Sequence, residues 1–206
     1  MSSDRAAFAV VILAAGASSR MGQPKMLLPW GDTTVLGHVI AQWTELKADQ
    51  VAVVTASHDK PVSEELDRRQ LSNRIFNDNP ADGMFSSVRS ASKWTHWDPA
   101  ITHWILTLGD QPHLQKATLS ALLDFARKND TLIVQPSFNG RPRHPVILPK
   151  IFFQQLRDTR SKTLKDFLAE HHSSISLLEA HDAGLDLDLD FPDDYRRAKK
   201  IYFDAR

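Results

Sequence analysis

The segment from residue 8 to residue 25 constrains the fold of this 206-residue chain more than any other. It begins with the run FAVVIL at 8–13, which is apolar at every position and rich in β-branched residues. Such a run is typical of a central parallel strand covered on both faces. Small residues follow at 14–19, and in open α/β sheets ligands bind beyond the carboxyl ends of the strands. The segment therefore predicts a parallel sheet with a ligand-binding loop after its first strand.

The composition of this loop indicates that the ligand is a polyphosphate. Its small side chains let backbone N–H groups approach anionic oxygens, and Arg20 and Lys25 add positive charge. The loop is not a P-loop, because five residues separate Gly16 from Gly22 and Gln23 follows where that motif has lysine. The G-x-G-x-x-G pattern is absent as well.

Composition excludes several classes of protein. Lys plus Arg and Asp plus Glu both number 25, so no net charge attracts nucleic acid or an anionic membrane. The absence of cysteine excludes disulfides, a thiolate nucleophile and sulfur-ligated metals. No apolar run approaches the ~20 residues of a membrane span, and Asp4 beside Arg5 disfavours a secretory signal. We expect a cytoplasmic protein, one domain over 1–206, with neither nucleic acid nor membrane as partner.

Apolar strand patterns alternate with helical patterns along the chain. Strands are predicted at 8–13, 51–55, 73–76, 102–108, 131–135 and 146–148. Helices are predicted at 35–46 after a cap at Asp32 or Thr33, after Pro61, and at 83–94, 115–128, 151–156, 163–171 and 195–203. This order predicts right-handed crossovers and an α/β, three-layer, Rossmann-like fold with a mostly parallel central sheet.

Aspartates at two places are candidate metal ligands. Asp110 follows the strand at 102–108 in the sequence LGDQP, and isolated carboxylates at strand ends suit Mg²⁺, which takes one or two of them together with phosphates and water. A plain Gly-Asp turn is the alternative. In the sequence LDLDLDFP, Asp186, Asp188 and Asp190 alternate with leucine. In a strand all three would project from one face, either into a site or, as on an edge strand, into solvent.

Two further segments carry polar candidates. Asn79 precedes an expected helix N-terminus, where Gly83, Ser86 and Ser87 can present donors to an anionic or polar ligand group. A capped helix after an Asx-Pro turn explains them equally well. In the sequence GRPRHPV at 140–146, His144 is either a site residue or a hydrogen-bonded structural histidine.

Together these motifs resemble the MobA-like nucleotidyltransferases of molybdenum cofactor synthesis. The opening signature of that family, L-A-A-G-x-S-x-R-M-G-x-x-K-L-L-L-P, is matched from Leu13 to Pro29 with Met26 in place of the first of the three leucines, and its second signature, G-D-Q-P, stands at 109–112. Guanylyl-transferring members usually read L-A-G-G, so Ala15 favours the cytidylyl-transferring branch. The resemblance implies transfer of CMP from CTP to the phosphate of molybdopterin, release of pyrophosphate and a requirement for Mg²⁺. A molybdoenzyme or its maturation chaperone is then a candidate partner.

The resemblance also implies roles for individual residues. Arg20, Lys25 and Asp110 are expected to be catalytic, Asp110 and Asp190 to hold the metal with Asp188 in reserve. The expected nucleotide-binding residues are Leu13, Ala14, Ala15, Gly16, Ser18, Ser19, Arg20, Lys25, Asn79, Gly83 and Ser86. The expected acceptor-binding residues are Gln111, Pro112, Arg143 and His144. Two positions depart from the family pattern, since Arg143 replaces a usual glycine and Phe191 a usual threonine.

Three alternatives remain open at this stage. The nucleotide could be GTP, or the acceptor a sugar phosphate or an alcohol phosphate. The chain could also be a non-catalytic carrier that binds a pterin cofactor and delivers it to a molybdoenzyme. A carrier would keep its ligand when Asp110 is lost, whereas an enzyme needs the metal.

Overall fold

The computed structural model describes residues 6–16, 18 and 20–204. Its strands are β1 (Phe8–Leu13), β2 (Pro29–Trp30), β3 (Thr33–Thr34), β4 (Gln50–Ala56), β5 (Arg74–Asn77), β6 (His103–Leu108), β7 (Ile133–Phe138), β8 (Arg141–Pro142), β9 (Val146–Pro149) and β10 (Ile175–Glu179). Its α-helices are α1 (Val35–Glu45), α2 (Lys60–Arg68), α3 (Met84–Lys93), α4 (Lys116–Lys128), α5 (Lys150–Gln155), α6 (Leu164–Glu170) and α7 (Pro192–Phe203). Short 3₁₀ turns are η1 (Lys25–Leu27), η2 (Pro80–Asp82), η3 (His172–Ser174) and η4 (Ala183–Asp186).

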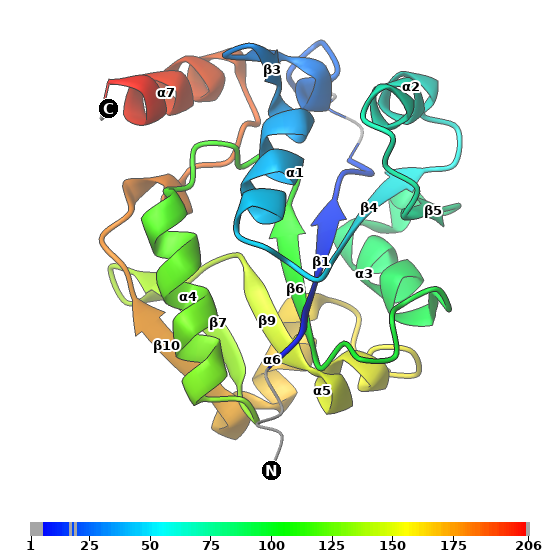
Figure 1. Ribbon diagram of the computed structural model, residues 1–206, viewed down its shortest axis with the longest axis vertical. Coiled ribbons are helices and arrows are strands. Elements are labelled where there is room, and N and C mark those ends of the chain that lie inside the picture. Colours follow the sequence, from blue (N-terminus) through cyan, green and yellow to red (C-terminus); the bar gives the residue numbers. More distant parts are fainter. Residues whose placement is uncertain (1–5, 17, 19, 205–206) are drawn as a thin grey trace.

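One mixed sheet forms the centre of the fold, with strands in the order β10-β7-β9-β6-β1-β4-β5 and β8 paired to β7. β4, β5 and β6 run parallel to β1, and β7 and β10 share that direction because β9 is antiparallel to both β6 and β7. Figure 1 shows β1 and β6 side by side, with their arrows toward the end of the molecule at which α7 lies. The mostly parallel sheet is confirmed.

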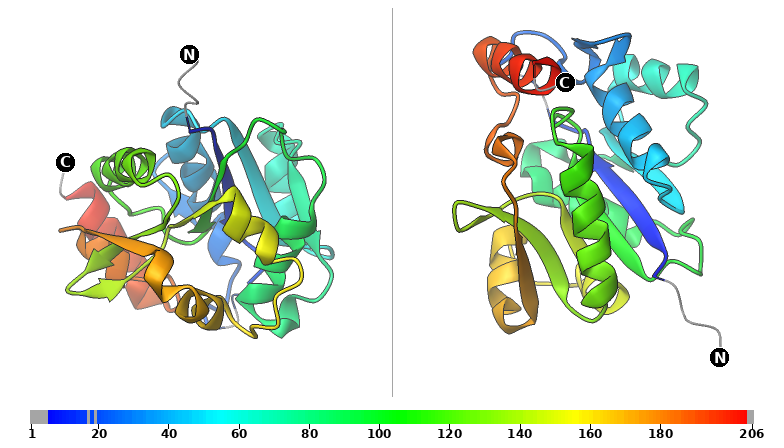
Figure 2. Two further views of the ribbon diagram at one scale, coloured as in Figure 1. Left: turned by 90° about the horizontal axis from the view of Figure 1, so that it is seen from below. Right: turned by 60° about the vertical axis from the view of Figure 1, so that its left-hand side comes forward.

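Helices cover both faces of this sheet, as the two turned views show (Figure 2). Alternate residues of β1 belong to different cores, as expected for a strand buried on both sides. Phe8, Val10 and Ile12 pack with α1, α2 and α4, whereas Ala9, Val11 and Leu13 pack with α3, α5 and α6. The predicted three-layer arrangement is therefore confirmed.

A third, smaller core fastens α7 across the β2–β3 hairpin. Trp30 is only 1% exposed and its ring packs near those of Tyr195, Tyr202 and Phe203. The Tyr195 hydroxyl also donates a hydrogen bond to the carbonyl of Pro29. This packing holds the C-terminal part of the chain beside the loop that follows β1.

The structure corrects the sequence reading in three places. Residues 185–190 do not form a strand, because η4 ends at Asp186 and the chain continues irregularly. The cap of α1 is Thr34, whose hydroxyl accepts from the N–H of Gly37, rather than Asp32 or Thr33. The strands β2, β3, β8 and β10 were not predicted. Within the described residues, no helix combines the length and the apolar character needed to cross a membrane.

Candidate active site

The candidate site lies where the order of the strands reverses. From β1 the chain first builds β4 and β5 on one side, and later β6 on the other. Leu13 and Leu108, the last residues of β1 and β6, are direct neighbours. Ligands of open α/β sheets bind at this kind of switch point. The loop after β1 and the turn after β6 therefore begin next to each other.

Gly109 makes the close approach of these two segments possible. Its N–H donates a 2.9 Å hydrogen bond to the carbonyl of Leu13. A Cβ at this position would lie 3.1 Å from the Leu13 oxygen, 3.1 Å from the Met26 sulfur and 3.3 Å from the Ala14 Cβ. Because any larger residue would push β6 away from β1, glycine sets the position of Asp110 against the first loop.

The first loop is folded back so that Lys25 enters the site. Ser18 adopts a left-handed conformation, with φ of 50°, and its hydroxyl accepts a 3.2 Å hydrogen bond from the N–H of Lys25. Met21 and Met26 are both 4% exposed and anchor the loop in the protein interior. Ala17 and the predicted nucleotide-binding residue Ser19 lie outside the described residues.

The side chain of Lys25 lies between two carboxylates. Its Nζ contacts the Asp110 carboxylate directly and lies 3.5 Å from Oδ1 of Asp190, whose Oδ2 is 2.8 Å from Nη1 of Arg20. The side chains of Lys25 and Asp110 are only 12% and 10% exposed. The four residues come from the β1 loop, the end of β6 and the segment before α7, so the fold unites the predicted cations with the predicted metal carboxylates.

Asp188 supplies a third carboxylate to the same place. Its Oδ1 accepts a 2.9 Å hydrogen bond from Nε2 of Gln111, a residue that is 4% exposed. The surrounding protein raises the pKa of Asp188 by desolvation, and the negative charges of Asp110 and Asp190 raise it further. Three carboxylates therefore lie near one another, and a bound cation would reduce the repulsion between them.

Burial of leucines, rather than strand pairing, orients these aspartates. Leu185, Leu187 and Leu189 are at most 5% exposed, so the aspartates between them face outward. The buried His113 fastens this segment to the turn after β6, since its Nε2 lies 3.0 Å from the carbonyl oxygens of both Gly184 and Leu187. The sequence analysis did not single out His113, although the residue directly follows the GDQP motif.

A cavity of about 370 Å³ occupies the space between these elements and is called the β1–β6 cleft below. It is lined by Leu13, Ala15, Gly16, Arg20, Lys25, Met26, Pro80, Gly83, Met84, Ser87, Leu108, Asp110, Asp188 and Asp190. An adjoining hollow of about 760 Å³ shares Ala15, Gly16 and Pro80 with it and adds Ser18. Met84 was not predicted. Ser87, predicted with Gly83 and Ser86 as a donor at the helix N-terminus, lines the cleft and is held by a 2.9 Å hydrogen bond from Nδ2 of Asn77 at the end of β5.

Most, but not all, of the predicted nucleotide-binding residues line these two spaces. Ala14 is 1% exposed and lies behind the loop, where its N–H donates to the carbonyl of Val54. Asn79 and Ser86 line a separate cavity on the other side of α3. The β1–β6 cleft thus takes its α3 wall from Gly83, Met84 and Ser87 instead.

These features can be compared with known proteins. Residues 10–175 match the model of the MobA-like NTP transferase domain. The chain belongs to this family. It is 32% identical over 196 residues to the molybdenum cofactor cytidylyltransferase of Escherichia coli K12, covering 93% of this chain and 95% of that protein. It also resembles the solved structure of the Rv0371c homologue from Mycobacterium sp. strain JC1, with 29% sequence identity and a TM-score of 0.77. That match covers 97% of this chain and 98% of the homologue.

The members of the MobA-like family are nucleotidyltransferases, and the donor atoms of the cleft suit a hard divalent cation. Asp110, Asp188 and Asp190 offer only oxygen donors, which Mg²⁺ and Mn²⁺ prefer. Among the residues that the structure describes, no three acidic or histidine side chains are close enough to form a metal centre by themselves. A cation would therefore complete its shell with phosphate oxygens and water. The Rv0371c protein of Mycobacterium tuberculosis, 26% identical over 95% of this chain and 99% of that one with a TM-score of 0.69, has been solved in complex with manganese.

On the predicted acceptor side of this MobA-like chain, the side chains do not line the cleft. Gln111 and Pro112 are buried and do not line it. The guanidinium of Arg143 contacts the carboxylate of Asp186, which is the aspartate of the alternating three that stays outside the site. Burial lowers the pKa of His144, whose Nδ1 lies 3.4 Å from the carbonyl of Leu106. A neutral, backbone-bonded His144 fits the structural interpretation better than that of a catalytic base.

Proposed function

We propose that this MobA-like enzyme transfers CMP from CTP to the phosphate of molybdopterin and releases pyrophosphate. The observation that carries the proposal is the position of Lys25, whose ammonium lies between Asp110 and Asp190 at the switch point of the sheet. The likeness to a cytidylyltransferase along 93% of the chain supports the choice of nucleotide and acceptor.

The reaction joins two anions, so positive charge is its main requirement. An oxygen of the acceptor phosphate attacks the α-phosphorus of CTP, the bond to the β-phosphate oxygen breaks, and pyrophosphate leaves with the electron pair. Arg20 and Lys25 are placed to hold the triphosphate and to stabilise the charge of the leaving pyrophosphate. The acceptor phosphate is already ionised near neutral pH, and for this reason the proposal needs no general base and assigns none.

We infer that Mg²⁺ is the cation. Asp110 and Asp190 would hold it, with Asp188, which also lines the cleft, in reserve. When bound, Mg²⁺ neutralises phosphate charge and polarises the phosphoryl group. Lys25 then contributes a movable positive charge that can leave the carboxylates for the phosphates.

We assign to Ala15 the selection of the nucleobase, cytosine rather than guanine. This half-buried residue lines both the β1–β6 cleft and the adjoining hollow, so its methyl group lies where the two spaces meet. Guanylyl-transferring relatives usually have glycine here, and we expect the Ala15 methyl to leave room for a pyrimidine rather than a purine. Ala15→Gly should raise the ratio of GTP to CTP turnover.

Pyrophosphate release by the purified protein tests the proposal. The assay contains molybdopterin and Mg²⁺, with CTP, GTP, ATP and UTP supplied in parallel. We expect turnover with CTP, its loss in Lys25→Ala and Asp110→Asn, and full turnover in the control Lys116→Ala, since Lys116 is exposed and pairs with Glu45. Turnover with GTP alone would overturn the base assignment. Nucleotide binding without any turnover would favour another acceptor or the carrier alternative.

A further inference from the structure

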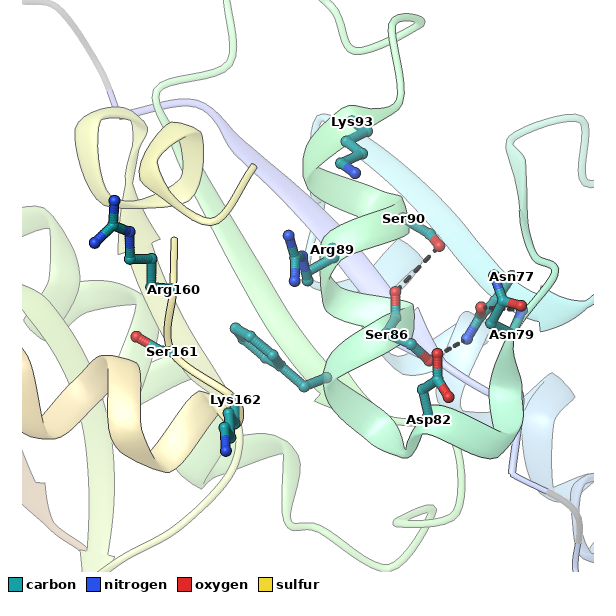
Figure 3. A pocket seen from close by; sticks show the side chains of 11 residues that line it. Asn77, Asn79, Asp82, Ser86, Arg89, Ser90, Lys93, Arg160, Ser161 and Lys162 are labelled. Atoms are coloured by element: carbon teal, nitrogen blue, oxygen red, sulfur yellow. Dashed lines mark hydrogen bonds between the residues drawn. The ribbon is translucent and has the colours of Figure 1, made fainter. Parts of the chain in front are cut away.

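A second polar cavity lies on the far side of α3 from the β1–β6 cleft. It has a volume of about 410 Å³ and lies between α3 and the segment 156–163 that joins α5 to α6 (Figure 3). We call it the basic pocket. It is lined by Asn77, Asn79, Asp82, Phe85, Ser86, Arg89, Ser90, Lys93, Arg160, Ser161 and Lys162.

Four cations line the basic pocket and only one carboxylate does. Arg89 and Lys93 come from α3, Arg160 and Lys162 from the opposite segment, and Asp82 is the only acidic residue of the lining, which leaves an excess of three positive charges. Figure 3 shows the two cations of α3 across the hollow from the segment that carries the other two.

These four cations have no ion-pair partner within the described part of the chain. Elsewhere in the same residues, cations such as Arg69, Arg74 and Lys116 are paired with carboxylates. Like charges that share one pocket repel each other. An anion in the pocket would be attracted by all four of these charges.

The hydroxyl groups of the pocket are already committed to the protein. Ser86 Oγ donates to the carbonyl of Gly83 at 2.7 Å, Ser90 Oγ donates to the carbonyl of Ser86 at 3.1 Å, and Ser161 Oγ donates to Glu170 at 3.0 Å. These bonds fix the walls of the pocket. The groups that remain available to a ligand are the four cations and the amide of the exposed Asn79.

The basic pocket is separate from the β1–β6 cleft, because the two share no lining residue. Residues 86, 89, 90 and 93 recur at helical spacing and so lie on one face of α3. The cleft is lined by Gly83, Met84 and Ser87 instead. A ligand in the basic pocket would therefore not occupy the β1–β6 cleft.

We propose that the basic pocket binds a small phosphate-bearing anion. Its volume of about 410 Å³ is in the range of small-molecule sites, about 300–1,000 Å³. Arg89 and Arg160 provide planar guanidinium groups, which bind phosphate oxygens in pairs, and Lys93 and Lys162 add point charges. Such a phosphate belongs either to a free compound or to a distal part of the acceptor.

Calorimetric titration of the full chain with pyrophosphate tests this site directly. The buffer contains EDTA, and the proteins compared are the wild type, Lys25→Ala, the double variant Arg89→Gln/Arg160→Gln, and the control Lys116→Gln/Arg127→Gln, which also loses two cations. We expect Lys25→Ala to retain binding in the pocket, the control to bind like wild type, and the Arg89/Arg160 variant to bind at least roughly tenfold more weakly. Equal binding by the two double variants, or complete loss in Lys25→Ala, would overturn the proposal.

Two further measurements separate the alternatives. The thermal midpoint of the Arg89/Arg160 variant should equal or exceed that of the wild type, because unpaired like charges are removed; a lower midpoint would mean that the arginines are structural and would overturn the proposal. If the double variant does not fold, Arg89→Gln alone carries the binding test. Steady-state kinetics of the Arg89/Arg160 variant identifies the source of the phosphate, and this measurement rests on the proposed reaction. A raised acceptor KM means that the acceptor carries it, whereas an unchanged KM with weakened pyrophosphate binding means a free compound.

Discussion

Substitution of Gly109 by alanine tests how the end of β6 positions the active site. The added Cβ would lie 3.1 Å from the Leu13 oxygen, 3.1 Å from the Met26 sulfur and 3.3 Å from the Ala14 Cβ. Ordinary contacts between carbon atoms are about 3.5–4.0 Å. The sulfur can move by rotation of its side chain, but the Leu13 carbonyl belongs to the central strand β1 and accepts the hydrogen bond from Gly109.

The expected cost follows from these contacts. The Met26 sulfur can move at little cost, whereas the Leu13 carbonyl oxygen is backbone and the Ala14 Cβ is fixed directly to it. We therefore expect Gly109→Ala to lower the free energy of unfolding by about 2 kcal/mol, within the ~1–3 kcal/mol that overpacking costs. With a urea dependence of roughly 2 kcal/mol per molar, the midpoint should fall by about 1 M. Because Asp110 would shift relative to Lys25, turnover should also fall by roughly tenfold or more.

Urea denaturation followed by tryptophan fluorescence provides the measurement, and the chain supplies a matched control. Among the residues that the structure describes, a Cβ at Gly16 meets no atom within 4 Å, and the backbone there is outside the left-handed region. Gly16→Ala should therefore leave stability unchanged or raise it by ~0.4–1 kcal/mol, while weakening nucleotide binding because Gly16 lines the cleft. A midpoint for Gly109→Ala within ~0.2 M of wild type would refute the steric argument.

Three other predictions concern stability. Burial lowers the pKa of three histidines below 6.5, namely His103, His113 and His144. Near pH 6.5 the unfolded chain therefore binds protons at these histidines that the folded chain does not bind, so the free energy of unfolding should fall as the pH drops from 7.5 to 5.5. The raised pKa of Asp188 has the opposite effect on stability, but it is one group against three. A urea midpoint that is constant or rises over this range would contradict the assignment. Burial would raise the pKa of Glu65, but its hydrogen bonds with Thr34 and Arg69 outweigh that effect and lower it; Glu65→Gln should cost about 1–3 kcal/mol, and an unchanged thermal midpoint would count against this network. Asp182 is fully buried and accepts from the N–H groups of Gly184 and Gln115 at 2.9 Å each. Asp182→Ala should lower the free energy of unfolding, measured by chemical denaturation, by roughly 1–3 kcal/mol for each donor left unpaired. A loss below about 0.5 kcal/mol, which is typical of surface substitutions, would show that water replaces the carboxylate.

The sequence predicted the parts of the fold that depend on local pattern. The apolar run of β1 and the helical spacing in α1 and α4 are strong enough that tertiary packing did not override them. By contrast, β10 (Ile175–Glu179) has an exposed Leu177 and no continuous apolar face, so its pairing with β7 is not visible in its residues. The cap of α1 moved to Thr34 because that hydroxyl also donates to Glu65, a contact across 31 positions.

The candidate site was predictable where one motif carries one role. Arg20, Lys25, Asp110 and Asp190 meet in the structure because they stand at the ends of neighbouring strands and in the segment that α7 holds beside them. The residues that position them were not predictable, since the bond between His113 and the carbonyl of Leu187 joins parts of the chain 74 positions apart. The extent of the domain, the roles of the acceptor-side residues and the receiving molybdoenzyme or chaperone stay predictions.

The segment 185–190 has a further consequence for how this enzyme can change. Its carboxylates are oriented by three leucine side chains that fill the interior, and no ladder of backbone hydrogen bonds fixes the segment to a sheet. The positions of Asp188 and Asp190 therefore depend on how the side chains of Leu187 and Leu189 fit into the interior. An exchange of Leu187 or Leu189 for another aliphatic residue would thus shift the cation site without altering any of its ligands.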